Sequence, residues 1–430
     1  MKYHLIDHQL FIKNRAKFTA QLKSKSIAVF NSNDIFTTGA DSTLPFYQHR
    51  DIFYLSGVDQ EESILLLFPD AMDKKHREIL FVKETNDHIA IWEGAKLNKA
   101  QATKTSGIES VYWLSEFDKV FFDLMTEAET IYFNTNEHYR QAIELESRED
   151  RFIKTVKDKF PAHNWAKSFP ILQSIRGVKE AQEIELLQTA CTITEKGFRR
   201  ILGFVKPGVM EYEIEAEFMH EFLRNRSKGF AYTPIIGSGY NACVLHYIEN
   251  NQQCKDGDML LLDVAAEYAN YSSDMTRTIP VNGRFTDRQK AVYNAVYRVK
   301  EEATKMLVPG TIWAEYHKEV GKIMTSELLD LGLIDKADVQ NEDPNWPAYK
   351  KYFMHGTSHH MGLDTHDYGE LKKPMKANMV FTVEPGIYIP EENMGIRLED
   401  DVVIQEKGDP FNLMRNIPIL ADEIEDLMNQ

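Results

Sequence analysis

The stretch MLLLDVAAEYANYSSD, residues 259–274, joins an apolar run to two carboxylates, Asp263 and Asp274. The apolar run is typical of a buried strand, and the turn-prone residues before Asp274 predict a hairpin that brings both acids side by side. One acid could instead cap the turn while the other pairs with Arg277. Two carboxylates that face each other at the end of an apolar strand are costly unless a cation lies between them.

A second segment, HGTSHHMGLDTHD at residues 355–367, holds four of the 14 histidines. Its two glycines, Gly356 and Gly362, allow a backbone to approach a ligand closely. The four imidazoles could share a loop by chance. Together with the glycines, however, they favour a metal and substrate site.

Two further acids, Glu384 and Glu399, stand at the ends of predicted strands. Pro385 restrains the backbone directly after Glu384, so a stiff turn holds that carboxylate. The alternation of a strand along residues 396–399 places Arg397 and Glu399 on the same face. Glu399 could also be an ordinary surface acid, because two aspartates follow it.

Four carboxylates and one imidazole therefore form a candidate ligand set: Asp263, Asp274, His359, Glu384 and Glu399. Oxygen-rich sets favour Mn²⁺-like ions over ions that prefer thiolates. Four carboxylates balance the charge of two divalent ions and leave room for a bridging hydroxide as the nucleophile. This arithmetic is typical of a two-metal hydrolase.

The composition of the 430 residues argues against several other functions. Lys plus Arg is 50 and Asp plus Glu is 66, so the formal charge is 50 − 66 = −16, whereas nucleic-acid binding needs a surplus of cations. The longest apolar runs are strand-sized, and the first residues lack the apolar core of a signal peptide. The three cysteines cannot all pair, which favours a reducing compartment. We expect a cytoplasmic protein without a membrane or nucleic-acid partner.

The first third of the chain alternates helix and strand signals. A helix is expected at 10–23, and short strands are expected at 26–30, 51–55, 63–68, 78–83 and 131–134, which predicts an α/β domain. The charged segment 148–170 lacks a long apolar period and contains two prolines, so the domains are predicted at 1–168 and 169–430. A long amphipathic helix is expected to begin near Lys179 and to end near Pro207.

The second domain contains a faint internal repeat. Residues 205–211, VKPGVME, are similar to residues 307–313, LVPGTIW, and each segment follows a helical stretch. Apolar strands that end in a carboxylate follow both segments, at 258–263 and 378–384. Either two related halves face each other, or the similarity is a coincidence.

Several of these segments together resemble the pita-bread metallopeptidases and, within them, the aminopeptidase P branch. The resemblance rests on residues 262–278, 355–359, 382–386 and 396–400, and on YQHRDIFYLSG at 47–57, which is similar to the branch's N-terminal signature. It implies an α/β (α+β) protein, with an N-terminal α/β domain followed by a C-terminal pita-bread metallopeptidase domain. It also implies hydrolysis of the N-terminal Xaa-Pro bond of peptides with proline in second position, using two divalent metal ions, with Mn²⁺ as the expected ion.

The resemblance assigns the metal ligands residue by residue. Asp263 would chelate one ion, while His359 and Glu384 would hold the other. Asp274 and Glu399 would bridge the pair. Glu384 would also take the proton of the attacking water and pass it to the leaving proline nitrogen.

Other positions match residues that handle the substrate in this family. His246 and His366 would donate hydrogen bonds to the scissile carbonyl as charge develops on its oxygen. His355, Tyr388 and Arg397 match positions around the proline-binding pocket. Tyr388 fits equally well as a core aromatic on a strand.

Prolidase, which cleaves Xaa-Pro dipeptides, and methionine aminopeptidase share the same fold and ligands. Ser358, where prolidases carry glycine, and the YIEN run after His246 favour aminopeptidase P, while the large N-terminal domain argues against methionine aminopeptidase. His360 and Met361 stand where relatives have an aromatic-aliphatic pair. An inactive pita-bread binding protein is a further alternative, but such proteins lose metal ligands and all five stand here.

The N-terminal domain of this family commonly mediates dimers or tetramers, so a homodimer or homotetramer is expected. Trp92 could reach a neighbouring active site in such an assembly. The simpler interpretation of Trp92 is a buried core residue.

Overall fold

The protein is described by a computed structural model that covers residues 2–138, 140 and 144–430. It forms two compact units: Tyr3–Arg176, and Gly177–Gln430 together with Lys2. No helix in the described ranges has the length and apolar character that a membrane span requires.

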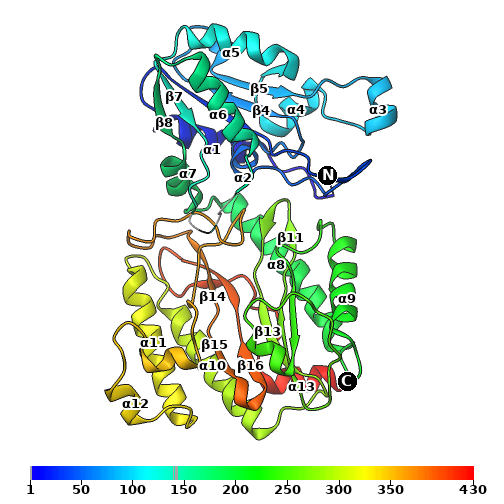
Figure 1. The fold of residues 1–430 in the computed structure, drawn as a ribbon, viewed down its shortest axis with the longest axis vertical. Helices are drawn as coiled ribbons and strands as arrows, with labels where there is room; N and C mark the ends of the chain where they lie inside the picture. The colour runs from blue at the N-terminus through cyan, green and yellow to red at the C-terminus, as the bar shows by residue number, and fades with distance from the viewer. Residues whose placement is uncertain (1, 139, 141–143) are drawn as a thin grey trace. The chain divides into compact units, whose positions relative to one another are not determined.

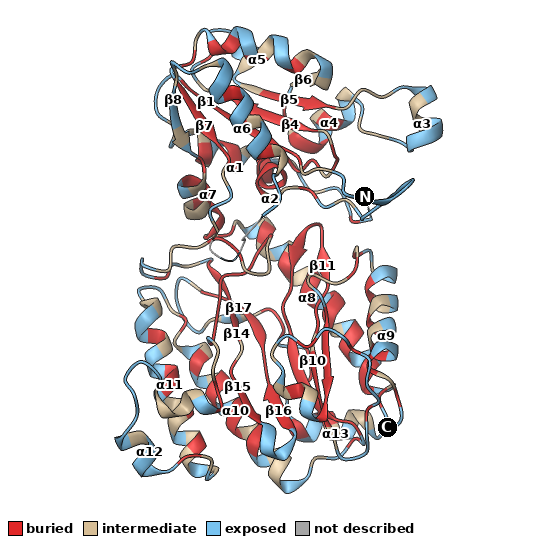
Figure 2. Cartoon of the chain, in the orientation of Figure 1, coloured by how far each residue is buried: buried red, intermediate tan, exposed pale blue. Residues whose placement is uncertain are grey.

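The first unit is built on a mixed six-stranded sheet with the order β6-β5-β4-β1-β7-β8 (Figure 1). Every residue of its central strand β1 is buried, as the red strands of Figure 2 show. The strands of the whole unit, in which β2 and β3 pair with each other outside the six-stranded sheet, are β1 (Ser26–Asn31), β2 (Thr37–Gly39), β3 (Ser42–Thr43), β4 (Ile64–Leu67), β5 (Glu78–Val82), β6 (Ser110–Trp113), β7 (Thr130–Phe133) and β8 (Asn164–Lys167). The helices are α1 (Gln9–Thr19), α2 (Arg50–Ser56), α3 (Asp87–Glu93), α4 (Lys99–Ser106), α5 (Phe117–Met125), α6 (Arg148–Lys159) and α7 (Phe169–Arg176). The α/β class predicted for this domain is confirmed.

The strand expected at 51–55 is wrong, because these residues form helix α2. His49 caps the helix by accepting a hydrogen bond from the backbone N–H of Asp51, and Gly57 ends it in the left-handed conformation (φ 69°). Residues 51–56 are all buried, so the helix has no polar face. A short apolar run without a polar face cannot be distinguished from a buried strand by its pattern.

The segment 148–170, interpreted as a boundary without periodicity, contains helix α6. Ser147 and Asp150 form a capping box at its start, and Ile153 and Val156 are buried against the sheet. Helix α7 also belongs to the first unit, because the buried Arg176 forms an ion pair of 2.7 Å with Asp51 of α2.

Trp92 lies on α3, and its exposed fraction is 81%. The interpretation of this tryptophan as a buried core residue is therefore wrong.

The second unit repeats the order helix, Pro-Gly turn, helix, in agreement with the internal repeat. Helix α8 leads through Gly208 (φ 98°) to α9, and helix α10 leads through Gly310 (φ 95°) to α11. Figure 1 shows the strands of this unit between α9 on one side and α11 on the other. The helices are α8 (Ala181–Leu202), α9 (Glu211–Arg224), α10 (Asp287–Lys305), α11 (Trp313–Asp330), α12 (Lys336–Gln340) and α13 (Ala421–Met428).

Two three-stranded sheets, β13-β10-β9 and β14-β17-β18, form the centre of this unit. The strands are β9 (Ile235–Ser238), β10 (Met259–Asp263), β11 (Glu267–Tyr268), β12 (Tyr271–Ser272), β13 (Thr276–Pro280), β14 (Val380–Val383), β15 (Gly386–Ile389), β16 (Met394–Arg397), β17 (Asp400–Val403) and β18 (Phe411–Asn412). Strand β10 pairs antiparallel with β13, and Asp263 lies opposite Thr276. The hairpin predicted from residues 259–274 is confirmed.

Candidate active site

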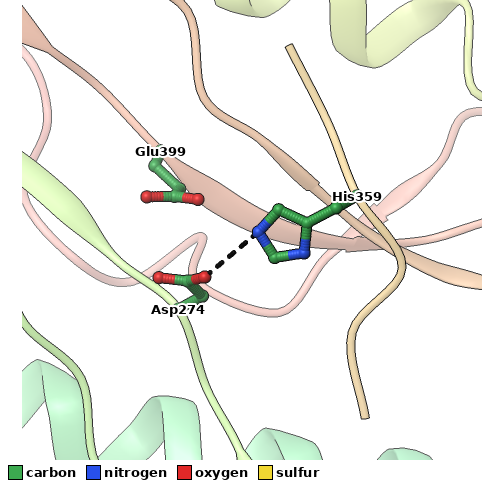
Figure 3. A group of neighbouring side chains, drawn as sticks. All are labelled: Asp274, His359 and Glu399. Atoms are coloured by element: carbon green, nitrogen blue, oxygen red, sulfur yellow. Dashed lines mark ion pairs between the residues drawn. The ribbon is translucent and has the colours of Figure 1, made fainter. Parts of the chain in front are cut away.

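Three of the predicted metal ligands meet at one point between the two central sheets. Asp274 precedes β13, Glu399 lies between β16 and β17, and His359 comes from the histidine-rich loop before β14. One possible ligand atom from each lies within 4.8 Å of the others (Figure 3). His359 Nε2 is 3.3 Å from Asp274 Oδ2, the contact dashed in Figure 3.

The other two predicted ligands border this group. Glu384 Oε1 lies 3.7 Å from His359 Nε2. Burial is the main cause of the raised pKa of Glu384, and the nearby charges of Asp274 and Asp263 raise it further. The fold therefore gathers all five residues, although they come from segments far apart in the chain.

The donor set fits divalent cations. Burial and mutual repulsion raise the pKa of Asp263 and Glu399, and burial raises the pKa of Glu384 to about 7. The Oδ1 atom of Asp263 is buried and accepts no hydrogen bond from any residue that the structure describes. A buried group of acids is costly unless cations compensate it, and oxygen-rich ligands suit hard or borderline divalent ions.

The imidazole of His359 is oriented for such a role. Its Nδ1 lies 3.0 Å from the carbonyl oxygen of His360, and a proton on Nδ1 leaves Nε2 free to face the acids. Burial alone would lower the pKa of His359, but Asp274 and Glu384 outweigh it and raise the pKa.

Several polar residues that the sequence did not point to hold the acids in place. Thr276 Oγ1 donates to Glu399 Oε2 at 2.7 Å, and Asp401 Oδ2 accepts from the backbone N–H of Asp274 at 3.0 Å. Thr276 begins β13 two positions after Asp274 and lies opposite Asp263, a closeness in sequence to both acids that could have identified the threonine.

Arg277 pairs with Asp400 at 2.6 Å, so the proposed pairing of Arg277 with Asp274 or Asp263 is wrong. Its Nη1 also donates to the backbone carbonyl of Glu399 at 2.6 Å. Glu399 is 2% exposed, so its interpretation as a surface acid is wrong as well.

A continuous chain of hydrogen bonds leads away from the metal ligands. Arg397 donates from Nη2 to Asp263 Oδ2 at 2.6 Å and from Nη1 to the Tyr388 hydroxyl at 2.8 Å. That hydroxyl lies 2.7 Å from His355 Nε2. Burial raises the pKa of Tyr388 to about 12 and lowers the pKa of His355 to about 3. Tyr388 is thus both a buried aromatic on β15 and a member of this polar chain.

His246 and the other histidines of the segment 355–367 lie in two different environments. The rings of His359 and His366 are 3.9 Å apart, so His366 lies beside the ligand group. Burial is the main cause of the lowered pKa of His355, and His246 lies near enough to contribute to that shift. His360 instead packs against Trp313 and Phe381, with ring centroids 6.3 and 4.3 Å away.

Comparison with known proteins identifies the architecture. Residues 185–406 match the model of metallopeptidase family M24, and residues 11–132 match the aminopeptidase P N-terminal domain. The Xaa-Pro aminopeptidase of Escherichia coli is 34% identical over 98% of both chains. The chain belongs to metallopeptidase family M24.

Solved structures of aminopeptidase P proteins are similar to this chain along nearly its entire length. A putative aminopeptidase P from Bacillus anthracis matches with a TM-score of 0.91, 31% identity and 99% coverage of both chains. A zinc-substituted E. coli aminopeptidase P in complex with product matches with a TM-score of 0.89, 32% identity and 99% coverage of both chains. The resemblance stated from the sequence and the two-part fold are confirmed. Membership of M24 implies divalent metal ions.

Proposed function

We propose that this M24 peptidase hydrolyses the bond between the N-terminal residue and a proline in second position, releasing the N-terminal residue. The observation that carries this function is the match to Xaa-Pro aminopeptidases along nearly the entire chain, at 34% identity, combined with the buried acid–histidine group. A Xaa-Pro bond is a tertiary amide without an N–H, so peptidases that grip this N–H cannot use it. Polarisation of the carbonyl by a metal needs no such donor.

Two divalent ions would bind here, and we propose Mn²⁺ because carboxylate oxygens outnumber the single imidazole. Asp263 would hold one ion, His359 and Glu384 the other, and Asp274 and Glu399 both. When bound, the ions polarise the scissile carbonyl and activate water at neutral pH. The buried Oδ1 of Asp263, which forms no hydrogen bond within the described part of the chain, supports this assignment.

Glu384 is the proposed proton carrier. It lies directly after β14, its backbone N–H donates to the Thr357 carbonyl at 2.8 Å, and Pro385 restrains the next residue. A carboxylate held in this way takes the proton of the attacking water and delivers it to the proline nitrogen as the bond breaks.

The histidines and the polar chain would handle the peptide. We propose that His246 and His366 donate hydrogen bonds to the scissile carbonyl oxygen, where negative charge develops. His355, Tyr388 and Arg397 would form the wall beside the proline ring. Their mutual hydrogen bonds fix this wall before the substrate arrives.

The test compares alanine release from Ala-Pro-Ala with cleavage of Ala-Pro and Ala-Ala-Ala. Cleavage of Ala-Pro-Ala but not of Ala-Ala-Ala is the expected result. Cleavage of the dipeptide alone would make this a prolidase. Turnover of none of the three, with metal bound, would favour an inactive binding protein.

We also propose that the first unit mediates a homodimer or homotetramer. Ile91 and Trp92 are 77% and 81% exposed on α3, which supports a role at a neighbouring chain. Light scattering of the wild type and Trp92→Ala tests this proposal. A monomeric wild type would refute it.

A cytoplasmic location is the last part of this proposal. It is supported by the three cysteines, which are all free. Cell fractionation tests it, and secretion of the protein would refute it.

A further inference from the structure

A buried carboxylate closes the loop that carries His246. Glu211, the first residue of α9, has no exposed surface. Its Oε1 accepts from the backbone N–H of Ser238, where β9 ends, at 2.9 Å, and its Oε2 accepts from the backbone N–H of Gln252 at 2.9 Å. Its own N–H donates to the Gln252 carbonyl at 3.0 Å. One side chain therefore joins the two ends of the loop 239–251.

A third hydrogen bond to the Glu211 carboxylate comes from Tyr247, the residue next to His246. The Tyr247 hydroxyl donates to Glu211 Oε2 at 2.7 Å. The Tyr247 ring is 8% exposed and packs in an apolar cluster with Ile235, Ala242, Leu261 and Tyr388. The backbone N–H of Tyr247 donates to the Val244 carbonyl at 3.2 Å, which closes the turn that presents His246. The ring, hydroxyl and backbone of Tyr247 are thus all restrained beside the histidine.

Burying the Glu211 carboxylate costs free energy that a residue with only a packing role would not need. Glu211 forms no ion pair in the part of the chain that the structure describes, and a buried carboxylate costs free energy unless donors compensate it. Here two backbone N–H groups, one hydroxyl and the N-terminus of α9 provide the compensation. The compensating groups all lie in the loop of His246 or at its ends, apart from the helix itself.

Asn250 braces the same loop from a second direction. Its Oδ1 accepts from the backbone N–H of Ile236 and its Nδ2 donates to the Pro234 carbonyl, both at 3.0 Å. The loop is consequently fixed to β9 and α9, while the His246 side chain itself remains exposed. A fixed backbone with an exposed imidazole is what a hydrogen-bond donor to a substrate requires.

We propose that Glu211 is a positioning residue that acts through Tyr247 to hold His246 where it donates to the scissile carbonyl. This inference rests on the role of His246 in the proposed function. It adds a residue of α9 that does not touch the substrate but sets the geometry of one that does.

Tyr247→Phe removes the hydroxyl alone, and Tyr212→Phe is the matched control, because Tyr212 lies on the same helix and is 54% exposed. We expect Tyr247→Phe to lower kcat for Ala-Pro-Ala about tenfold or more, since small misplacements of a catalytic group are costly. Bound metal and the kcat of the Tyr212→Phe control should stay unchanged, while the melting temperature of Tyr247→Phe should fall by no more than a few degrees, because the buried Glu211 loses one of its donors. Wild-type kcat in Tyr247→Phe would overturn the proposal.

A double-mutant cycle with His246→Ala distinguishes positioning from a general structural effect. If Tyr247 acts through His246, Tyr247→Phe should lower kcat less than about twofold in the His246→Ala background. The same fold-loss in both backgrounds would overturn the proposal. Full activity of His246→Ala would overturn it too, because no catalytic histidine would then be positioned.

Hydrogen exchange tests the clamp without using peptidase activity. Glu211→Gln should speed the exchange of backbone amides in residues 239–252, while Tyr212→Phe should not. Unchanged exchange in Glu211→Gln would overturn the clamp. If the wild type cleaves no Xaa-Pro peptide but the exchange changes as expected, the proposed function fails while the clamp stands.

Discussion

Asp400 lies between two buried cations, Arg277 and Lys300. Its replacement by asparagine should lower the free energy of unfolding of the second unit. Its Oδ1 is 2.6 Å from Arg277 Nη2, and its Oδ2 is 2.5 Å from Lys300 Nζ. The exposed fractions of the three side chains are 2%, 0% and 1%. Arg277 also donates a hydrogen bond to the backbone carbonyl of Glu399, so this triad helps to fix the position of a predicted metal ligand.

The size of the effect follows from burial. Removing one partner of a buried ion pair costs about 3–5 kcal/mol, because the remaining charge is left uncompensated. At about 2 °C per kcal/mol for a domain of ~250 residues, Asp400→Asn should lower the melting temperature by about 6–10 °C. Calorimetry of the metal-loaded enzyme measures this shift.

A control on α10, the helix that carries Lys300, distinguishes the contribution of a buried charge from that of an exposed one. Arg298 pairs with Glu327 at 2.6 Å, but its side chain is 56% exposed, so Arg298→Met should cost less than about 1 kcal/mol. If Asp400→Asn melted within about 2 °C of the wild type, the assignment of stability to the triad would be refuted.

The same triad predicts a pH dependence. Burial would raise the pKa of Asp400, but Arg277 and Lys300 outweigh it and hold the pKa well below its usual range. A carboxyl group with a depressed folded-state pKa stabilises fully above its unfolded value of about 3.9 and loses this contribution as the pH falls towards the folded value. The difference in unfolding free energy between wild type and Asp400→Asn should therefore shrink below about pH 4 in urea titrations. A difference that grows on acidification would contradict the sign.

Three further substitutions test other parts of the structure. Asp274→Asn should abolish turnover and weaken metal binding while the circular dichroism spectrum stays native; a fully active variant would sink the two-metal assignment. Arg397→Lys should lower kcat/KM about tenfold or more, because an ammonium cannot reproduce the guanidinium bonds to Asp263 and Tyr388; unchanged kinetics would argue against the polar chain. In the separated monomer, Trp92→Ala should change the free energy of unfolding by less than about 0.5 kcal/mol, because the ring is 81% exposed in the single chain, and a large loss in the monomer would restore the core interpretation.

Asp263 and Glu384 could be predicted because each follows directly on an apolar strand, where a carboxylate is costly without a cation. The hairpin of Asp263 and Asp274 is a local feature, so its turn and its alternation are visible in the sequence. The shared face of Arg397 and Glu399 is also local, and both side chains bond to the Thr276 hydroxyl.

Long-range pairing could not be predicted in the same way. Arg277 finds its partner Asp400 at a distance of 123 positions, whereas the sequence suggested nearer acids. Helix α2 was missed because its complete burial removes the polar face that marks a helix. Trp92 was misplaced because composition does not say which apolar side chains a fold leaves exposed.

The most direct test of the central claim follows alanine release from Ala-Pro-Ala by the wild type before chelation, after chelation and after addition of Mn²⁺, with Asp274→Asn in parallel. We predict that release stops with the chelator, returns with Mn²⁺ at two ions per chain, and stays absent in Asp274→Asn. Undiminished release by the chelated enzyme would contradict a metal-dependent Xaa-Pro aminopeptidase.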